Sequence, residues 1–156
     1  MKGKIVFITG ASSGSGEGCA RKFASQGSDL ILNARNVAKL EELKKELETK
    51  YGVRVCLLPF DVRDRKAASA ALASLPEEWK NIDVLVNNAG LVIGVDKEFE
   101  GNLDEWDIMI DTNIKAINRD LIEISEGKLQ SDELIKMQFE AIRSLIDDCE
   151  NIMLNK

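Results

Sequence analysis

The sequence contains no histidine and only one tyrosine among its 156 residues. Histidine activates most nucleophilic serines and cysteines and is a common ligand of zinc, so sites of those kinds are excluded. A general acid or base in this chain must therefore be an aspartate, a glutamate, a lysine, a cysteine or the single tyrosine, Tyr51.

Cysteine and long apolar runs are scarce as well. The three cysteines are too few and too widely spaced for a disulfide framework or a thiolate metal site, which favours a reducing, cytoplasmic compartment. The apolar run near the start, Ile5–Ile8, has only four residues, so we expect neither a signal peptide nor a membrane span. A net charge of −6 argues against nucleic acid as a partner.

Strand and helix patterns alternate over the first two thirds of the chain. Short apolar runs predict strands at Ile5–Ile8, Leu30–Leu32, Val53–Leu58 and Ile82–Val86. Amphipathic or alanine-rich stretches predict helices at Ser15–Gln26, Val37–Lys50 and Arg65–Leu75. Repeated β-α-β units of this length predict an α/β fold with a parallel sheet and right-handed crossovers.

Strand patterns stop after Gly101. An apolar stripe over residues 103–126 predicts one long helix, and a second stripe predicts another helix over residues 131–154. We expect this C-terminal helical hairpin to cover the otherwise exposed edge of the fourth strand, within one chain or in a homo-oligomer.

A glycine-rich turn, TGASSGSG at residues 9–16, directly follows the first strand and opens the first helix. In such a turn Gly10 permits the sharp bend, Gly14 lets the backbone approach a pyrophosphate, and Gly16 lets helix and strand pack closely. The N-terminus of the helix would present free N–H groups to the phosphates. The turn therefore predicts a dinucleotide site, and the alternative is a purely structural Gly/Ser loop.

This turn resembles the TGxxxGxG fingerprint of the short-chain dehydrogenase/reductase family. Three further segments are similar to that family in order and spacing: Asp61-Val62, Asn87–Gly90 (NNAG), and Asp111–Ile114. The matching segments cover about residues 1–116, and residues 117–156 show no resemblance to the family. The resemblance implies a truncated Rossmann-like sheet of strand order 3-2-1-4 over residues 1–116, followed by a helical tail over residues 117–156.

The resemblance also implies roles for single residues. Asp61 would accept a hydrogen bond from the adenine amino group, and Val62 would form an apolar wall beside it. Asn87, Ala89 and Gly90 would line the nicotinamide ribose, with Asn88 bracing the sheet. The alternative for Asp61 is a carboxylate that caps a turn.

Cofactor choice is indicated at the end of the second strand. Ala34 stands where NAD-preferring relatives carry an aspartate, and Arg35 follows it, suited to pair with a 2′-phosphate. We therefore predict NADP(H) rather than NAD(H), unless Arg35 is an ordinary solvated residue at a helix start. The candidate cofactor-binding residues are Gly10, Ser12, Ser13, Gly14, Ser15, Gly16, Arg35, Asp61, Val62, Asn87, Ala89 and Gly90.

Two of the residues near the turn depart from the family pattern. Ser15 replaces the Ile or Leu that relatives pack beneath the cofactor. Gly18 lies inside the first helix, where glycine costs roughly 1 kcal/mol against alanine. Both changes are expected to loosen cofactor binding without preventing it.

Of the family's catalytic residues, only the asparagine has a counterpart in this sequence. The family uses a Tyr-x-x-x-Lys pair and a serine, but Tyr51 is followed at that spacing by Val55. Only Asn113 matches the catalytic constellation. Lys115, Asp111 and Asp107 share its helix, and we interpret them as solvated charges, so we predict little or no hydride transfer.

Three hypotheses follow. The first is an NADP(H)-binding oxidoreductase scaffold without its catalytic half. The second is an interaction module that has a vestigial nucleotide site and forms oligomers through the helices at residues 103–126 and 131–154. The third is the first part of an oxidoreductase joined to foreign sequence. The substrate stays open.

Overall fold

The computed structural model describes residues 1–91 and 102–115. Four parallel strands form one sheet in the order β3-β2-β1-β4. They are β1 (Ile5–Ile8), β2 (Asp29–Leu32), β3 (Val55–Leu57) and β4 (Val84–Val86). The helices are α1 (Gly14–Ser25), α2 (Val37–Tyr51), α3 (Arg65–Ala73) and α4 (Leu103–Ile110), with a 3₁₀ turn, η1, at Glu77–Trp79. The predicted α/β class and strand order are confirmed.

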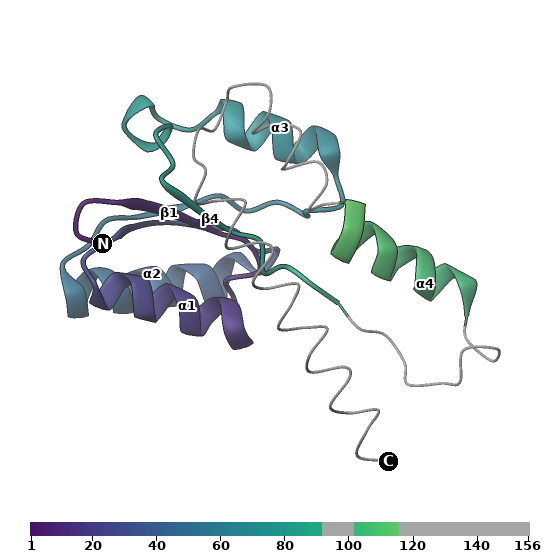
Figure 1. Ribbon diagram of the computed structural model, residues 1–156, viewed down its shortest axis with the longest axis horizontal. Coiled ribbons are helices and arrows are strands. Elements are labelled where there is room, and N and C mark those ends of the chain that lie inside the picture. The colour runs from purple at the N-terminus through teal and green to yellow at the C-terminus, as the bar shows by residue number, and fades with distance from the viewer. Residues whose placement is uncertain (92–101, 116–156) are drawn as a thin grey trace, which may run out of the picture.

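The sheet is covered on both faces (Figure 1). Helices α1 and α2 lie on one face, and α3 lies on the other. Successive side chains of β1 point to opposite faces, so Val6 and Ile8 join one apolar cluster while Ile5 and Phe7 join the other. This explains why the strand is a continuous apolar run and not an alternating one.

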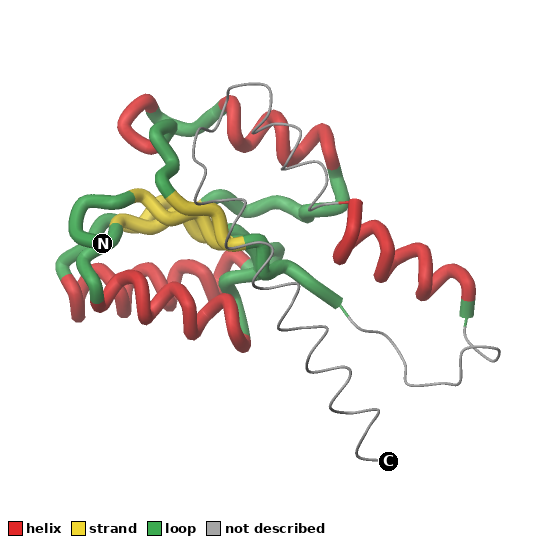
Figure 2. The backbone as a smooth tube through the Cα atoms, in the orientation of Figure 1, coloured by secondary structure: helices red, strands yellow, loops and turns green. Residues whose placement is uncertain are grey.

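The strands are in register, so their carboxyl ends lie at one edge of the sheet. Ile8 of β1 pairs with Leu32 of β2 and Val86 of β4, and Leu32 pairs with Leu57 of β3. Figure 2 shows the loops that leave the strands gathering at the end of the sheet nearer to α4. The segments after the four strands are thereby brought together, at the edge where open α/β sheets bind ligands.

Close packing of α1 on the sheet depends on missing side chains. Gly16 is buried, and a Cβ atom placed there would collide with the side-chain nitrogen of Asn88 and the carbonyl oxygen of Gly10. At Gly10 a Cβ would lie 2.8 Å from the Cα of Ala89. At Gly18, by contrast, nothing lies within 4 Å of the added atom. The role predicted for Gly16 in helix–strand packing therefore has a steric basis.

The long helix predicted from residue 103 is helical through all of its described residues, but it changes from α to π geometry. Helix α4 ends at Ile110, and a π-helical turn follows over Asp111–Lys115. In this turn the Thr112 hydroxyl donates to the carbonyl oxygen of Ile108 at 2.8 Å, and the Asn113 side chain is bonded to the backbone of Leu91. The rest of that helix, the helix predicted at 131–154 and the helical hairpin lie outside the described residues.

Two strands are shorter than predicted. The third begins at Val55 and not at Val53, and the fourth begins at Val84 and not at Ile82. Just before β3, the Arg54 N–H donates to the Asp29 carboxylate at 2.8 Å, so a side chain takes part in the pairing where the strand starts. Apolar patterning does not reveal such a partner.

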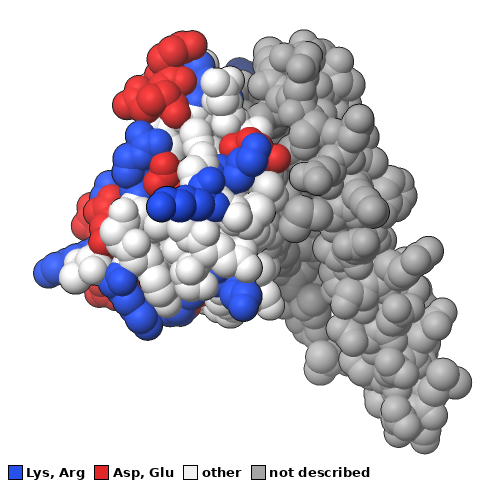
Figure 3. Space-filling model, turned by 60° about the vertical axis from the view of Figure 1, so that its left-hand side comes forward, with Lys and Arg blue, Asp and Glu red and all other residues white. Residues whose placement is uncertain are grey.

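The surface carries charges of both signs. On the face drawn in Figure 3, Lys and Arg side chains are interspersed with Asp and Glu over the described part of the chain. Within residues 1–91 and 102–115, none of the helices has the length and apolar character that crossing a membrane requires.

Gly16 and Gly18 of α1 provide a matched pair of substitutions. Gly16→Ala is expected to destabilise the fold by about 1–3 kcal/mol, because Asn88 and Gly10 must move away. Gly18→Ala meets no neighbour and is expected to stabilise it by up to about 1 kcal/mol. Urea unfolding followed by circular dichroism measures both changes. Equal effects of the two substitutions would contradict the close packing of α1 on the sheet.

Candidate cofactor-binding site

A cleft of about 310 Å³ opens at the carboxyl edge of the sheet. It contains most of the candidate residues, namely Gly10, Ser12, Ser13, Ser15, Arg35, Asp61, Val62, Ala89 and Gly90. Gly14, Gly16, Asn87 and Asn113 do not line it. The cleft also contains residues to which the sequence analysis gave no cofactor role, namely Asn33, Ala34, Phe60, Arg63, Asn88, Leu91 and Thr112.

The glycine-rich turn exposes backbone at the mouth of α1. Gly10 and Gly14 have φ angles of 65° and 57°, which favour glycine, and nothing lies within 4 Å of a Cβ placed at Gly14. Ser13, the N-cap of α1, makes no side-chain capping bond, whereas Asn36 and Asp64 cap α2 and α3. The first N–H groups of α1 are thus available, as an anion site at a helix N-terminus requires.

Thr9 and Asn88 join the turn after β1 to the segment after β4. The Thr9 hydroxyl oxygen accepts from the N–H groups of Asn88 and Ala89 at 3.1 and 3.0 Å. The Asn88 amide in turn donates to the carbonyl oxygens of Thr9 and Gly10 at 3.1 and 3.2 Å. Asn88 therefore braces the sheet, as the resemblance implied. The side-chain nitrogen of Asn87 is buried and has no hydrogen-bond partner among the described residues.

Asn33 forms the floor of the cleft, a role the sequence analysis did not identify. Its side chain is 1% exposed and donates to the carbonyl oxygens of Leu58 and Phe60 at 2.9 and 3.1 Å. Its own carbonyl oxygen accepts from Ala11 in the glycine-rich turn at 2.9 Å. In the sequence, Asn33 is only a polar residue directly after an apolar strand. Such a residue could equally begin a solvent-exposed loop.

Two arginines and one carboxylate lie on the same side of the cleft. Arg63 donates to both oxygens of Asp61, from Nη2 at 2.6 Å and from Nε at 3.0 Å. Arg35 Nη1 lies 3.9 Å from the same carboxylate. The Arg63 guanidinium holds the pKa of Asp61 at about 2, so Asp61 is ionised at neutral pH.

Asp61 also takes the role that we weighed as the alternative. Its Oδ1 accepts from the backbone N–H of Arg63 at 2.9 Å, and its carbonyl oxygen accepts from Asp64. These bonds form a turn of the kind that aspartate favours before a helix. The carboxylate therefore both lines the cleft and shapes the turn.

Asn113 lies behind the cleft. Its Oδ1 accepts from the Leu91 N–H at 2.9 Å, and its Nδ2 donates to the Leu91 carbonyl oxygen at 2.9 Å. Gly90 allows this approach, since a Cβ there would lie 3.3 Å from Asn113 Oδ1. The observed contacts of Asn113 thus fix the segment after β4.

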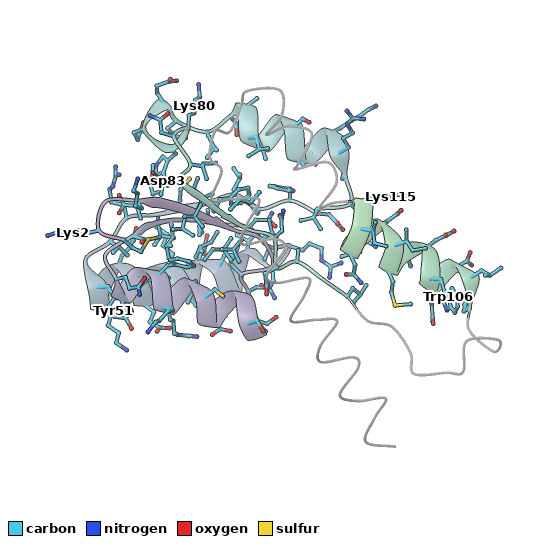
Figure 4. The ribbon with its side chains drawn as sticks, in the orientation of Figure 1. Lys2, Tyr51, Lys80, Asp83, Trp106 and Lys115 are labelled. Atoms are coloured by element: carbon cyan, nitrogen blue, oxygen red, sulfur yellow. The ribbon has the colours of Figure 1, made fainter. Side chains whose placement is uncertain are left out.

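The remaining acid–base candidates are poorly suited to proton transfer at the cleft. Lys115 pairs with Asp111 at 2.6 Å, and this partner raises the pKa of its ammonium group, so Lys115 keeps its proton. Its side chain is 71% exposed, as expected for a solvated charge. Tyr51 and Lys115 lie toward opposite ends of the sheet (Figure 4). Tyr51 packs on the apolar cluster beneath α2 instead.

The cleft suits a dinucleotide. It combines an uncapped helix N-terminus, open backbone at Gly14 and two arginines beside an apolar wall at Val62. No three metal-ligating side chains lie together within residues 1–91 and 102–115. The family comparison agrees with this geometry, because the short chain dehydrogenase family model matches residues 4–121. The chain belongs to the short-chain dehydrogenase family.

Individual family members match over the same region. The NADP-dependent 3-hydroxy acid dehydrogenase of Escherichia coli K12 is 45% identical over 113 residues, which cover 72% of this chain and 44% of that protein. The enzyme of the same name from Schizosaccharomyces pombe is 44% identical over 138 residues, covering 86% of this chain and 53% of that protein. The chain thus spans about half the length of these relatives. The family match extends past residue 116, where we expected the resemblance to end.

Solved structures of the family have the same fold. Serine dehydrogenase from Escherichia coli superposes with a TM-score of 0.66 at 46% identity, covering 72% of this chain and 50% of that one. L-sorbose reductase from Gluconobacter frateurii, solved with NADPH and L-sorbose, has a TM-score of 0.70 at 34% identity and covers 76% and 44%. A closed form of serine dehydrogenase was solved with NADP⁺.

Removing the Asn33 amide is expected to weaken the fold at the cleft. Asn33→Leu keeps the branching at Cγ but removes both donors to the carbonyl oxygens of Leu58 and Phe60, which should cost about 2 kcal/mol or more of unfolding free energy. Asn81→Ala, at an exposed asparagine, serves as the control and should change stability by less than about 0.5 kcal/mol. Chemical denaturation measures both, and an unchanged midpoint for Asn33→Leu would contradict the assigned role.

Proposed function

We propose that this chain binds NADP(H) in the cleft at the carboxyl edge of its sheet. The observation that carries the proposal is that Arg35 lines the same cleft as the uncapped start of α1, with Ala34 in place of an acid. The Arg35 side chain is 67% exposed and lies 3.9 Å from the Asp61 carboxylate, beyond hydrogen-bond distance, so it is available to a ligand. Relatives that are NADP-dependent or were solved with NADP⁺ or NADPH support the choice of cofactor.

Each part of the cleft has a role in this proposal. The backbone at Ser13–Ser15 receives the pyrophosphate, and Arg35 with Ser12 and Ser13 receives the 2′-phosphate. Asp61 and Val62 hold the adenine, while Ala89 and Gly90 line the nicotinamide ribose. When bound, the nicotinamide supplies or accepts a hydride.

We further propose that the 156-residue chain by itself transfers hydride slowly or not at all. The sequence contains no Tyr-x-x-x-Lys pair, and Tyr51 is not among the residues that line the cleft. Lys115 keeps its proton in an ion pair, so it does not replace the missing acid–base group. A positioned acid–base group contributes about 10²–10⁴-fold to such reactions, and this factor would be lost.

An interaction module, and the first part of an oxidoreductase joined to foreign sequence, stay as alternative hypotheses. A partner-binding role is supported by Ile110 and Ile114 near the end of α4, which are 40% and 54% exposed. Homo-oligomerisation through residues 103–126 and 131–154 rests on the apolar stripes alone. The cytoplasm stays the predicted compartment on the basis of cysteine content, and the division at residue 116 stays a prediction.

Cofactor binding is testable by titration with NADPH and NADH, followed by nucleotide fluorescence. We expect NADPH to bind at least about tenfold more tightly, because Arg35 pairs with the added phosphate. Arg35→Ala should remove most of this preference and leave NADH binding nearly unchanged. Lys39→Ala, which removes an exposed cation on α2 outside the cleft lining, is the control. Equal affinities of the unaltered chain for both nucleotides would refute NADP(H) specificity.

Hydride transfer is testable separately. With saturating NADPH and a panel of small aldehydes, ketones and 3-oxo acids, loss of absorbance should stay near the rate without protein. This expectation holds for a chain that binds NADPH but lacks the acid–base group. Turnover well above that background would overturn the proposal that this chain is catalytically weak, without affecting the proposal that it binds the cofactor.

A further inference from the structure

Asp61 lies near two arginines at one side of the cleft, and its carboxylate is much closer to Arg63 than to Arg35. Arg63 bonds both carboxylate oxygens, with its Nη2 2.6 Å from Oδ2 and its Nε 3.0 Å from Oδ1. Arg35 Nη1 is 3.9 Å from Oδ2, beyond hydrogen-bond distance. The side chain of Arg63 is 34% exposed and that of Arg35 is 67% exposed.

This unequal sharing has an electrostatic consequence. An unpaired carboxylate beside Arg35 would attract that guanidinium and would repel a phosphate dianion at the same place. Because Arg63 already donates to both oxygens of Asp61, this carboxylate attracts Arg35 and repels a phosphate less strongly than an unpaired carboxylate would. Arg35, 67% exposed and 3.9 Å from the carboxylate, is therefore accessible to an incoming anion.

We propose that Arg63 is a specificity-determining residue of the cleft: by holding both oxygens of Asp61, it leaves Arg35 free to bind a 2′-phosphate. The inference rests on the proposed NADP(H) function and deepens it. Arg63 acts here by neutralising Asp61 and not by contacting the phosphate itself. The variants below distinguish these two roles.

The turn around Asp61 does not need the Arg63 side chain. The bond from the Arg63 backbone N–H to Asp61 Oδ1, at 2.9 Å, survives any substitution other than proline. Asp64 caps α3 independently, accepting from the N–H groups of Lys66 and Ala67 at 3.0 Å. Arg63→Ala is therefore expected to fold, and circular dichroism verifies this.

The experiment compares dissociation constants for NADPH and NADH in four proteins: the unaltered chain, Arg63→Ala, Asp61→Asn, and the double variant Arg63→Ala/Asp61→Asn. In Arg63→Ala, Asp61 is free to capture Arg35, so the preference for NADPH should fall about tenfold. In the double variant no carboxylate remains, and the preference should return to within about threefold of the unaltered chain. Any loss of adenine contacts caused by Asp61→Asn affects both nucleotides and cancels in the ratio.

Arg65→Ala is the matched control, since it removes an exposed arginine two residues further along that does not line the cleft. It should leave the ratio unchanged. If the double variant shows the same loss as Arg63→Ala, then Arg63 contacts the phosphate directly and the inference is wrong. It is also wrong if Arg63→Ala keeps the full preference. Failure of the unaltered chain to bind either nucleotide would instead refute the proposed function.

Discussion

The cleft depends above all on the hydrogen bonds between Thr9 and the segment after β4. The Thr9 hydroxyl oxygen accepts from two consecutive N–H groups, and the Asn88 amide returns two bonds to the turn after β1. These bonds fix the glycine-rich turn against β4, and Gly16 must lack a side chain because Asn88 occupies that space. Since β1 and β4 are adjacent parallel strands, this one junction sets the distance between the glycine-rich turn and the segment at Ala89 and Gly90 on the two sides of the cleft.

A second constraint is electrostatic. The cleft places a carboxylate near the arginine that would bind a 2′-phosphate, an arrangement that opposes anion binding unless the carboxylate is neutralised. Arg63 pairs with Asp61 and thereby reduces its effect on nearby charges. The same pairing lowers the pKa of Asp61, so the carboxylate stays ionised. The same carboxylate shapes the turn before α3, so one residue links the local backbone, the charge balance of the cleft and the choice of cofactor.

Much of this arrangement could be predicted from the sequence, and what could not has a physical reason. Apolar runs and the glycine spacing determine local structure and carry a family pattern, so the strand order and the sharp glycine turn after β1 were predictable. Asn33 was missed because its bonds join two loops that only the sheet brings together. The pairing of Arg63 with Asp61 is local, but its bearing on Arg35 depends on the loop after β2 lying beside the loop after β3. The π-helical turn at residues 111–115 was missed because an apolar stripe does not distinguish α from π geometry, and its Asn113 bonds to Leu91, 22 residues away, which the pattern does not show.

The chain separates two tasks that the family combines. Among residues 1–91 and 102–115, those that line the cleft run from Gly10 to Thr112. The acid–base pair of the family, by contrast, is missing from the whole sequence. Binding draws on preorganised backbone donors and paired charges, while proton transfer needs one group of suitable pKa at one position. Under the proposed function, these 156 residues therefore hold a dinucleotide and leave its reactive ring without a proton partner of their own.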